Sequence, residues 1–245
     1  MRTPVHPSRS PLRSVSLPLA LLLAPSVACA DDFVVSPTDL DFGAIYVSEA
    51  TSIAVVIVNV SGVPQTPNFA GGAPFDHDNF GSSQNCAGVT LPPGGSCRFT
   101  YEFHPVSEGP KSSGTTIGIN GTNHTITMAG TGLFPIAVGP LVLDFGDVPV
   151  GGTATRSVTF ANISGVPQTP NYAGGAPFDH DNFGSSQNCV GVTLPPGGSC
   201  RFTYQFHPVS PGPKTSSTTV GVDNRNFGIT LFGNFGDVIF REGFD

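Results

Sequence analysis

Charged side chains are scarce in this 245-residue chain, and basic ones are the scarcest. Only 11% of the residues are charged, with 17 acidic and 10 basic side chains. Three of the basic residues, Arg2, Arg9 and Arg13, fall within the first 30 positions, so residues 31–245 carry seven basic and 17 acidic side chains, a net charge of −10. Nucleic acids and anionic membranes attract clustered positive charge. The sequence therefore argues against both as partners.

The sequence also lacks helical periodicity, a membrane-length apolar run and catalytic motifs. Beyond the N-terminal region, no stretch repeats apolar residues every 3.6 positions. No G-x-S-x-G, H-E-x-x-H, P-loop or C-x-x-C motif is present. Two near-identical halves offer no asymmetric set of acid, base and nucleophile. We therefore predict that the protein is not an enzyme and uses no cofactor or metal ion.

The first 30 residues have the three parts of a secretory signal peptide. The basic start precedes the apolar run Leu17 to Ala24, which is shorter than the ~20 residues of a membrane helix. An A-x-A site ends at Ala30, after which cleavage is expected. A lipid anchor on Cys29 is the alternative, although the usual Leu three positions earlier is missing. We expect a secreted, extracellular or periplasmic protein.

A long internal repeat organises the rest of the chain. Residues 61–120 recur 103 positions later as residues 164–223, and the two copies differ at nine positions. The 31 Gly and 24 Pro residues punctuate short β-branched and Phe-rich runs, which is typical of an all-β protein. We predict two tandem β-sandwich domains, 31–133 and 134–235. The tail 236–245 lies outside the repeat and is expected to be disordered or to lie at a sheet edge.

Four cysteines remain after the signal peptide, and an even number in an oxidising compartment indicates disulfides. Each copy holds one pair separated by ten residues: Cys86 and Cys97, then Cys189 and Cys200. We predict one disulfide within each domain. Free thiols, bridges between the domains and a redox role are the alternatives.

Alternating residues assign faces to the expected strands. Leu40 and Phe42 are expected to face a core, and so are Val55 and Ile57. In the run 97–105, Phe99, Tyr101 and Phe103 share the inner face. The outer face of the strand at 51–60 carries Ala54, Val56 and Val58, where the second copy has Ser157, Thr159 and Ala161. This difference reflects either a tolerant surface or a docking face. Asn120-Gly121 predicts a tight hairpin turn.

The polar segment between two phenylalanines, FDHDNF at 75–80 and 178–183, is the candidate site. One hypothesis is a metal site, but the segment does not fit the EF-hand pattern. The other is a polar loop anchored by Phe75 and Phe80. The candidate ligand-contact residues are Asp76, His77, Asp78, Asn79, Asp179, His180, Asp181 and Asn182. Elsewhere, Asn59-Val60-Ser61 and Asn162-Ile163-Ser164 fit the glycosylation sequon.

Several of these motifs occur together in one family. LDFG at 40–43, the strand start V-x-V-G-x2-A at 148–154, NC…LPPGGSC, F-x-Y-x-F-x-P and a closing G-T-G resemble the choice-of-anchor D repeat. That repeat is similar to the immunoglobulin-like sandwiches of the ASH/Hydin type. The resemblance implies a seven-stranded sandwich without the buried Trp of antibody domains, in agreement with the absence of Trp. It also implies a secreted or surface-anchored bacterial protein.

Two functions therefore stay open. The first is a non-catalytic structural spacer of tandem immunoglobulin-like domains in the cell envelope. The second is an extracellular module that binds a protein or a glycan through the loops 71–85 and 174–188, or through a strand edge. The sequence leaves the oligomeric state open.

Overall fold

The computed structural model describes residues 31–149 and 151–235. All the regular secondary structure assigned to these residues is β-strand. The expected all-β class is confirmed. The predicted signal peptide, Cys29 and the tail 236–245 lie outside the described residues. No helix that could span a membrane occurs in the described part of the chain.

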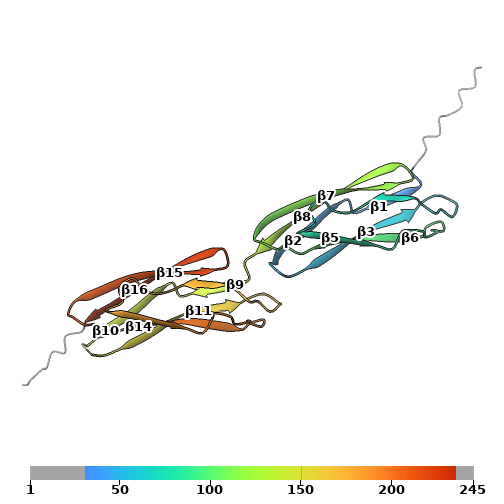
Figure 1. Cartoon of the computed structure of the whole chain (residues 1–245). Helices are drawn as coiled ribbons and strands as arrows, with labels where there is room; N and C mark the ends of the chain where they lie inside the picture. Colours follow the sequence, from blue (N-terminus) through green and yellow to red (C-terminus); the bar gives the residue numbers. More distant parts are fainter. Residues whose placement is uncertain (1–30, 150, 236–245) are drawn as a thin grey trace, which may run out of the picture. The chain divides into compact units, whose positions relative to one another are not determined.

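The first eight strands form two four-stranded sheets that enclose one hydrophobic core (Figure 1). All neighbouring strands are antiparallel except β2 and β8. The first sheet has the order β1 (Phe33–Ser36), β3 (Thr51–Asn59), β6 (Ser96–Phe103), β5 (Phe80–Gln84). The second sheet has the order β2 (Asp39–Tyr46), β8 (Thr122–Leu133), β7 (Gly109–Ile119), β4 (Phe69–Gly71). We call this unit the first sandwich.

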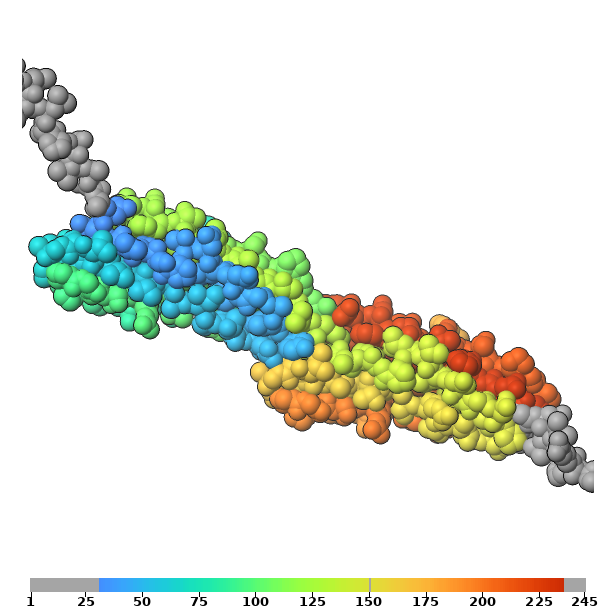
Figure 2. Space-filling model, turned by 180° about the vertical axis from the view of Figure 1, so that it is seen from behind, coloured from blue at the N-terminus to red at the C-terminus, as the bar shows by residue number. Residues whose placement is uncertain are grey.

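The last eight strands repeat the arrangement around a second core, and we call this unit the second sandwich. Its first sheet has the order β9 (Ile136–Gly139), β11 (Ala154–Asn162), β14 (Ser199–Phe206), β13 (Phe183–Gln187). Its second sheet has the order β10 (Val142–Val148), β16 (Arg225–Phe235), β15 (Pro213–Val222), β12 (Tyr172–Gly174). In Figure 2 the yellow-green segment that contains β10 lies beside the red strand β16, its parallel partner.

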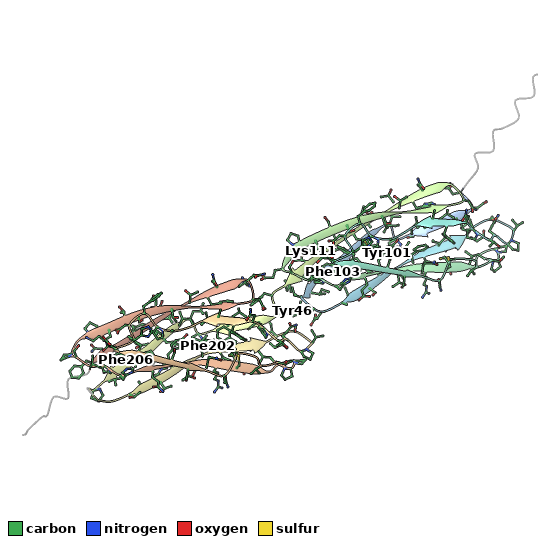
Figure 3. All side chains as sticks on the ribbon, in the orientation of Figure 1. Tyr46, Tyr101, Phe103, Lys111, Phe202 and Phe206 are labelled. Carbon is green, nitrogen blue, oxygen red and sulfur yellow. A yellow bond between two sulfur atoms is a disulfide. The ribbon has the colours of Figure 1, made fainter. Side chains whose placement is uncertain are left out.

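The two-residue period of β6 builds the first core as the sequence predicts. Phe99, Tyr101 and Phe103 are buried, whereas Arg98 and Glu102 are exposed. Tyr101 and Phe103 are labelled in Figure 3. The Phe103 ring reaches across to Phe42 of β2, with ring centroids 5.7 Å apart. Val55, Ile57 and Leu40 are buried as well. The predicted inner faces are therefore confirmed.

Ala54, Val56 and Val58 on the outer face of β3 are half-buried, and so are their counterparts on the outer face of β11. Ala54, Val56 and Val58 therefore form no exposed apolar patch, and the docking hypothesis for this face gains no support.

Each sandwich has eight strands, where the family resemblance implies seven. The additional strand arises because the N-terminal segment divides at Pro37: β1 joins one sheet and β2 joins the other. Proline has no N–H to donate to a ladder, so it marks the point where the chain leaves the first sheet. Pro140 occupies the same point between β9 and β10.

The recurring Asp-x-Gly of LDFG forms a bulge in each sandwich. The ladder of β2 with β8 shifts register between Asp41 and Ala44. The Asp41 carboxylate accepts the Gly43 N–H at 2.8 Å, and Gly43 has a φ of +68°. Asp144 and Gly146 repeat this geometry. The predicted hairpin is also present, because Asn120 and Gly121 join β7 to β8 with positive φ at both positions.

The two cores share no residue, and each set of eight strands pairs only within itself. The domain boundary between residues 133 and 134 stays a prediction.

Candidate functional site

A disulfide closes the end of the β5–β6 hairpin in each sandwich. Cys86 follows β5 and Cys97 is the second residue of β6, and the two are bonded. Cys189 and Cys200 form the equivalent bridge. All four side chains lie in the hydrophobic cores. Both predicted disulfides are therefore present, which indicates that the chain folds in an oxidising compartment.

The segment 71–85, predicted as a loop, is a loop mainly between β4 and β5, because Phe80–Gln84 pairs with β6 as β5. Its first part runs along the edge of β7. Gly72 N–H donates to the Thr116 carbonyl at 2.9 Å, and Phe75 N–H donates to the Gly114 carbonyl at 3.1 Å. Asp76 N–H then donates to the Ser113 hydroxyl at 3.0 Å. These bonds extend the short pairing of β4 with β7.

The start of this loop requires the glycine pair Gly71 and Gly72, because the backbone there lies too close to neighbouring atoms to leave room for a side chain. Gly71 and Gly72 have φ values of +74° and +94°, which disfavour side chains. A Cβ at Gly72 would lie 2.6 Å from the Phe99 ring, and a Cβ at Gly71 would overlap the Thr116 carbonyl oxygen. The pair is therefore explained by the fold.

Asp76 closes a turn with its own carboxylate. One carboxylate oxygen accepts the N–H groups of Asp78 and Asn79 at 3.1 and 3.2 Å. The other accepts the Asn79 side-chain amide at 2.9 Å. Such an Asx turn fixes the backbone locally. Both oxygens of Asp76 are thus engaged inside the loop.

Asn79 ties the turn to the segment that follows β6. Its side-chain oxygen accepts the Val106 N–H at 3.2 Å, and its carbonyl accepts the His104 N–H at 2.9 Å. Asn79 is 8% exposed. Asn182 holds the corresponding position in the second copy. The eight candidate residues therefore divide into two groups: Asp76, Asn79, Asp179 and Asn182 build the turns, and His77, Asp78, His180 and Asp181 are exposed.

Phe80 anchors the loop as expected, but the expectation for Phe75 is wrong. Phe80 is fully buried, whereas Phe75 is 79% exposed and Phe178 is 78% exposed. The chain beside β7 is extended, so successive side chains alternate, and Pro74 takes the inward position. The Phe75 ring instead lies on the outer face of β7, where a Cβ on Gly114 would come within 4.0 Å of it.

The metal hypothesis finds no ligand set here. Among the described residues, no group of three or more His, Cys, Asp or Glu side chains could hold a metal ion. Asp76, the carboxylate nearest the centre of the turn, already accepts three N–H groups.

The outer face of the second sandwich contains a feature that the sequence interpretation missed. Thr215 and Ser217 of β15 and Thr230 of β16 are exposed on this face, and a shallow hollow of about 530 Å³ lies between them and Phe178. Its lining residues are Phe178, Asp179, Thr215, Ser216, Ser217 and Thr230. The alternation Thr230, Phe232, Asn234 in the sequence predicts this outward row, provided that Leu231 is assigned to the core.

Residues 135–228 match the family ASH, described as Abnormal spindle-like microcephaly-assoc'd, ASPM-SPD-2-Hydin. This confirms the ASH-type resemblance for the second sandwich. The chain is also 29% identical over 206 residues to the cilia- and flagella-associated protein 74 of Chlamydomonas reinhardtii. That match covers 80% of this chain and 10% of the relative, so the chain spans about a tenth of the relative's length.

Two solved structures align with this chain at low sequence identity. The PapD-like domain 7 of human CEP192 aligns with a TM-score of 0.34 at 12% identity, over 42% of this chain and 87% of that domain. Domains 1–6 of the surface layer protein SbsC align with a TM-score of 0.35 at 15% identity, over 76% of this chain and 23% of that one. Neither similarity carries an argument about function.

Proposed function

We propose that this chain is a non-catalytic, exported protein in which each sandwich presents one loop, 71–85 or 174–188, to a partner at a cell surface. The exposed phenylalanine at the head of each turn carries this proposal: Phe75 is 79% exposed and Phe178 is 78% exposed. An exposed ring contributes little to the stability of its own fold. A partner that covers it removes apolar area from water at about 25 cal/mol per Å².

The fixed backbone around each ring supports binding. Phe75 N–H is bonded to β7, and the next residue closes the turn with three hydrogen bonds. A loop held in one conformation loses little conformational entropy when it binds a partner. His77 and Asp78 project from the same turn and can donate or accept hydrogen bonds at the rim of the contact.

A purely structural spacer is the second candidate function. The disulfide in each core favours it, because it stiffens each unit of such a spacer. The match of residues 135–228 to the ASH family supports a non-catalytic module in either case. Under the spacer hypothesis the exposed phenylalanines are dispensable, and under the binding hypothesis they are required.

Export is supported by two independent features. The N-terminal 30 residues have the pattern of a cleavable signal peptide, and both cysteine pairs are oxidised. The choice-of-anchor D resemblance suggests a bacterial cell envelope as the destination.

The test compares surface binding by two double variants of the full mature chain. Phe75→Ser/Phe178→Ser removes both exposed rings, and Val89→Ser/Val192→Ser is the matched control, because both valines are 39% exposed on the disulfide loops. We expect the first variant to lose at least tenfold in binding to intact cells of the source organism, measured by flow cytometry with a labelled protein. Equal binding by the wild type and both variants would favour the spacer.

A further inference from the structure

The outer face of the second sandwich carries two adjoining shallow hollows, which together we call the cleft. The first, of about 530 Å³, is bounded by Phe178. The second, of about 480 Å³, is bounded by Phe232. Thr215 and Thr230 line both hollows, so the cleft is continuous across β15 and β16.

Two aromatic rings from distant parts of the sequence lie along this cleft. Phe178 comes from the loop 174–188, and Phe232, which is 36% exposed, comes from β16. Phe232 is the cross-strand partner of Thr215, and Thr230 is the partner of Ser217, so the four side chains share one face of the sheet. Hydroxyl groups therefore line the base of the cleft, and each of its two hollows is bounded by one aromatic ring.

The remaining polar groups disfavour an anionic ligand. The charged side chains that line the two hollows are three carboxylates and one ammonium: Asp144, Asp147, Asp179 and Lys214. The Lys214 ammonium donates to the Pro211 carbonyl at 3.1 Å. Asp147 accepts the Asn234 side-chain amide at 2.8 Å. With a net charge of −2 at the cleft, an anionic ligand would be repelled.

We propose that this cleft binds a neutral glycan chain, a proposal that rests on the proposed binding function and specifies the class of ligand. A pyranose ring presents C–H groups on its faces and hydroxyls around its rim. The two phenylalanine rings match the faces, while the threonine and serine hydroxyls, the Asp144 and Asp147 carboxylates and Asn234 match the rim. Carboxylates and amides accept and donate hydrogen bonds to sugar hydroxyls without requiring a charged ligand.

The first sandwich provides an internal comparison. Its equivalent hollow, of about 620 Å³, lies between β2, β7 and β8 but has Ala129 where the second has Phe232. Ala44 and Thr131 replace the hydrogen-bonded pair Asp147 and Asn234, and Gly114 replaces Ser217. The first sandwich therefore keeps one aromatic ring and fewer polar groups, and we expect it to bind glycans more weakly.

The experiment measures binding of the full mature chain to three hexasaccharides by calorimetry. Chitohexaose and cellohexaose are neutral, and hexagalacturonate is acidic. We expect at least one neutral hexasaccharide to bind and the acidic one not to bind. Phe232→Ala should weaken that binding about tenfold, as truncation of a central aromatic contact does, whereas Val192→Ser should leave it unchanged. Ala129→Phe should strengthen binding by the first sandwich, seen as new amide shifts on β7 and β8.

Other results separate this proposal from the function on which it rests. If neither neutral hexasaccharide binds, or if Phe232→Ala leaves their affinity unchanged, the glycan cleft is wrong. Preferred binding of hexagalacturonate also overturns it. Treatment of the target cells distinguishes the partner: periodate, which cleaves glycans, should abolish surface binding, and protease should not. Loss of binding after protease alone, together with sensitivity to Phe75→Ser/Phe178→Ser, would keep the proposed function and reject the glycan.

Discussion

Asn59 and Asn162 are buried residues whose side chains each fix a turn by hydrogen bonds to its backbone. Asn59 is fully buried, and its amide donates to the carbonyls of Val63 and Leu91 at 2.9 and 2.8 Å. Its side-chain oxygen accepts the N–H and the hydroxyl of Ser61. The Asn-x-Ser pattern that fits a glycosylation sequon is therefore a structural element, because the amide that a glycan would modify is inside the protein.

Asn59→Ala should destabilise the first sandwich by about 2–4 kcal/mol, because it removes four hydrogen bonds made by a fully buried side chain. Asn123→Ala is the control, since Asn123 is exposed on β8 and should change stability by less than about 0.5 kcal/mol. Urea unfolding measures both. Equal stability of the two variants would contradict the role of the Asn59 network.

Buried tyrosines make the stability depend on alkaline pH. Burial raises the pKa of Tyr101 and Tyr204 to about 12, from an ordinary value of 10.0. The Tyr101 hydroxyl also has no hydrogen-bond partner. In the unfolded chain the phenol loses its proton near pH 10, whereas the folded protein keeps it. The unfolded state therefore binds fewer protons above pH 10, and the stability must fall as pH rises.

We expect the free energy of unfolding to keep its full tyrosine contribution below about pH 10 and to decrease between pH 10 and 12. Tyr101→Phe/Tyr204→Phe should flatten this decrease and cost little at pH 7, because the Tyr101 and Tyr204 hydroxyls are unpaired. The measurement is urea unfolding at a series of pH values. If the double variant loses stability above pH 10 as steeply as the wild type, the cause lies elsewhere.

At the scale of elements, the disulfide and the β5–β6 hairpin stabilise one another. Each bridge joins residues 11 positions apart. Closing a loop of that size removes about 3 kcal/mol of chain entropy from the unfolded state. For a sandwich of about 100 residues, this is a large part of a typical stability of about 5–15 kcal/mol.

Cys86→Ala/Cys97→Ala should therefore lower the stability of the first sandwich by about 3 kcal/mol, and Cys189→Ala/Cys200→Ala should do the same in the second. Thermal unfolding with each pair changed separately would measure the two effects. A reduced wild-type sample should show both losses together. A change below about 1 kcal/mol would mean that the unfolded chain is already compact near the hairpin.

The elements were largely predictable, because they depend on local alternation. The inner residues of β3 and β6 follow a period of two, and the Asn120-Gly121 turn selects its own hairpin. The division of the first strand was not predicted, because it requires that β1 and β2 find partners in different sheets. The position of Phe75 was also missed, since its face depends on pairing with β7, which lies about 40 residues away.

At the scale of the whole molecule, two cores without a common residue predict two independent folding units. Fragments 31–133 and 134–235 should each unfold cooperatively and form their own disulfide. Dispersed amide resonances and urea unfolding of each purified fragment test this prediction. A fragment that stays unfolded would show that the predicted boundary cuts through one folding unit.

The sequence by itself determined the all-β class, the pairing of four cysteines within two copies and the inner faces of the long strands, because these depend on composition, spacing and period. Only the tertiary structure decided which polar residues of FDHDNF are exposed. Asp76 and Asn79 are engaged by backbone N–H groups of their own turn and of the segment after β6. Phe75 faces solvent because its neighbour Pro74 takes the inward position beside β7. Side chains compete for a limited set of hydrogen-bond partners and a limited core volume, and that competition is settled by contacts between residues far apart in the chain.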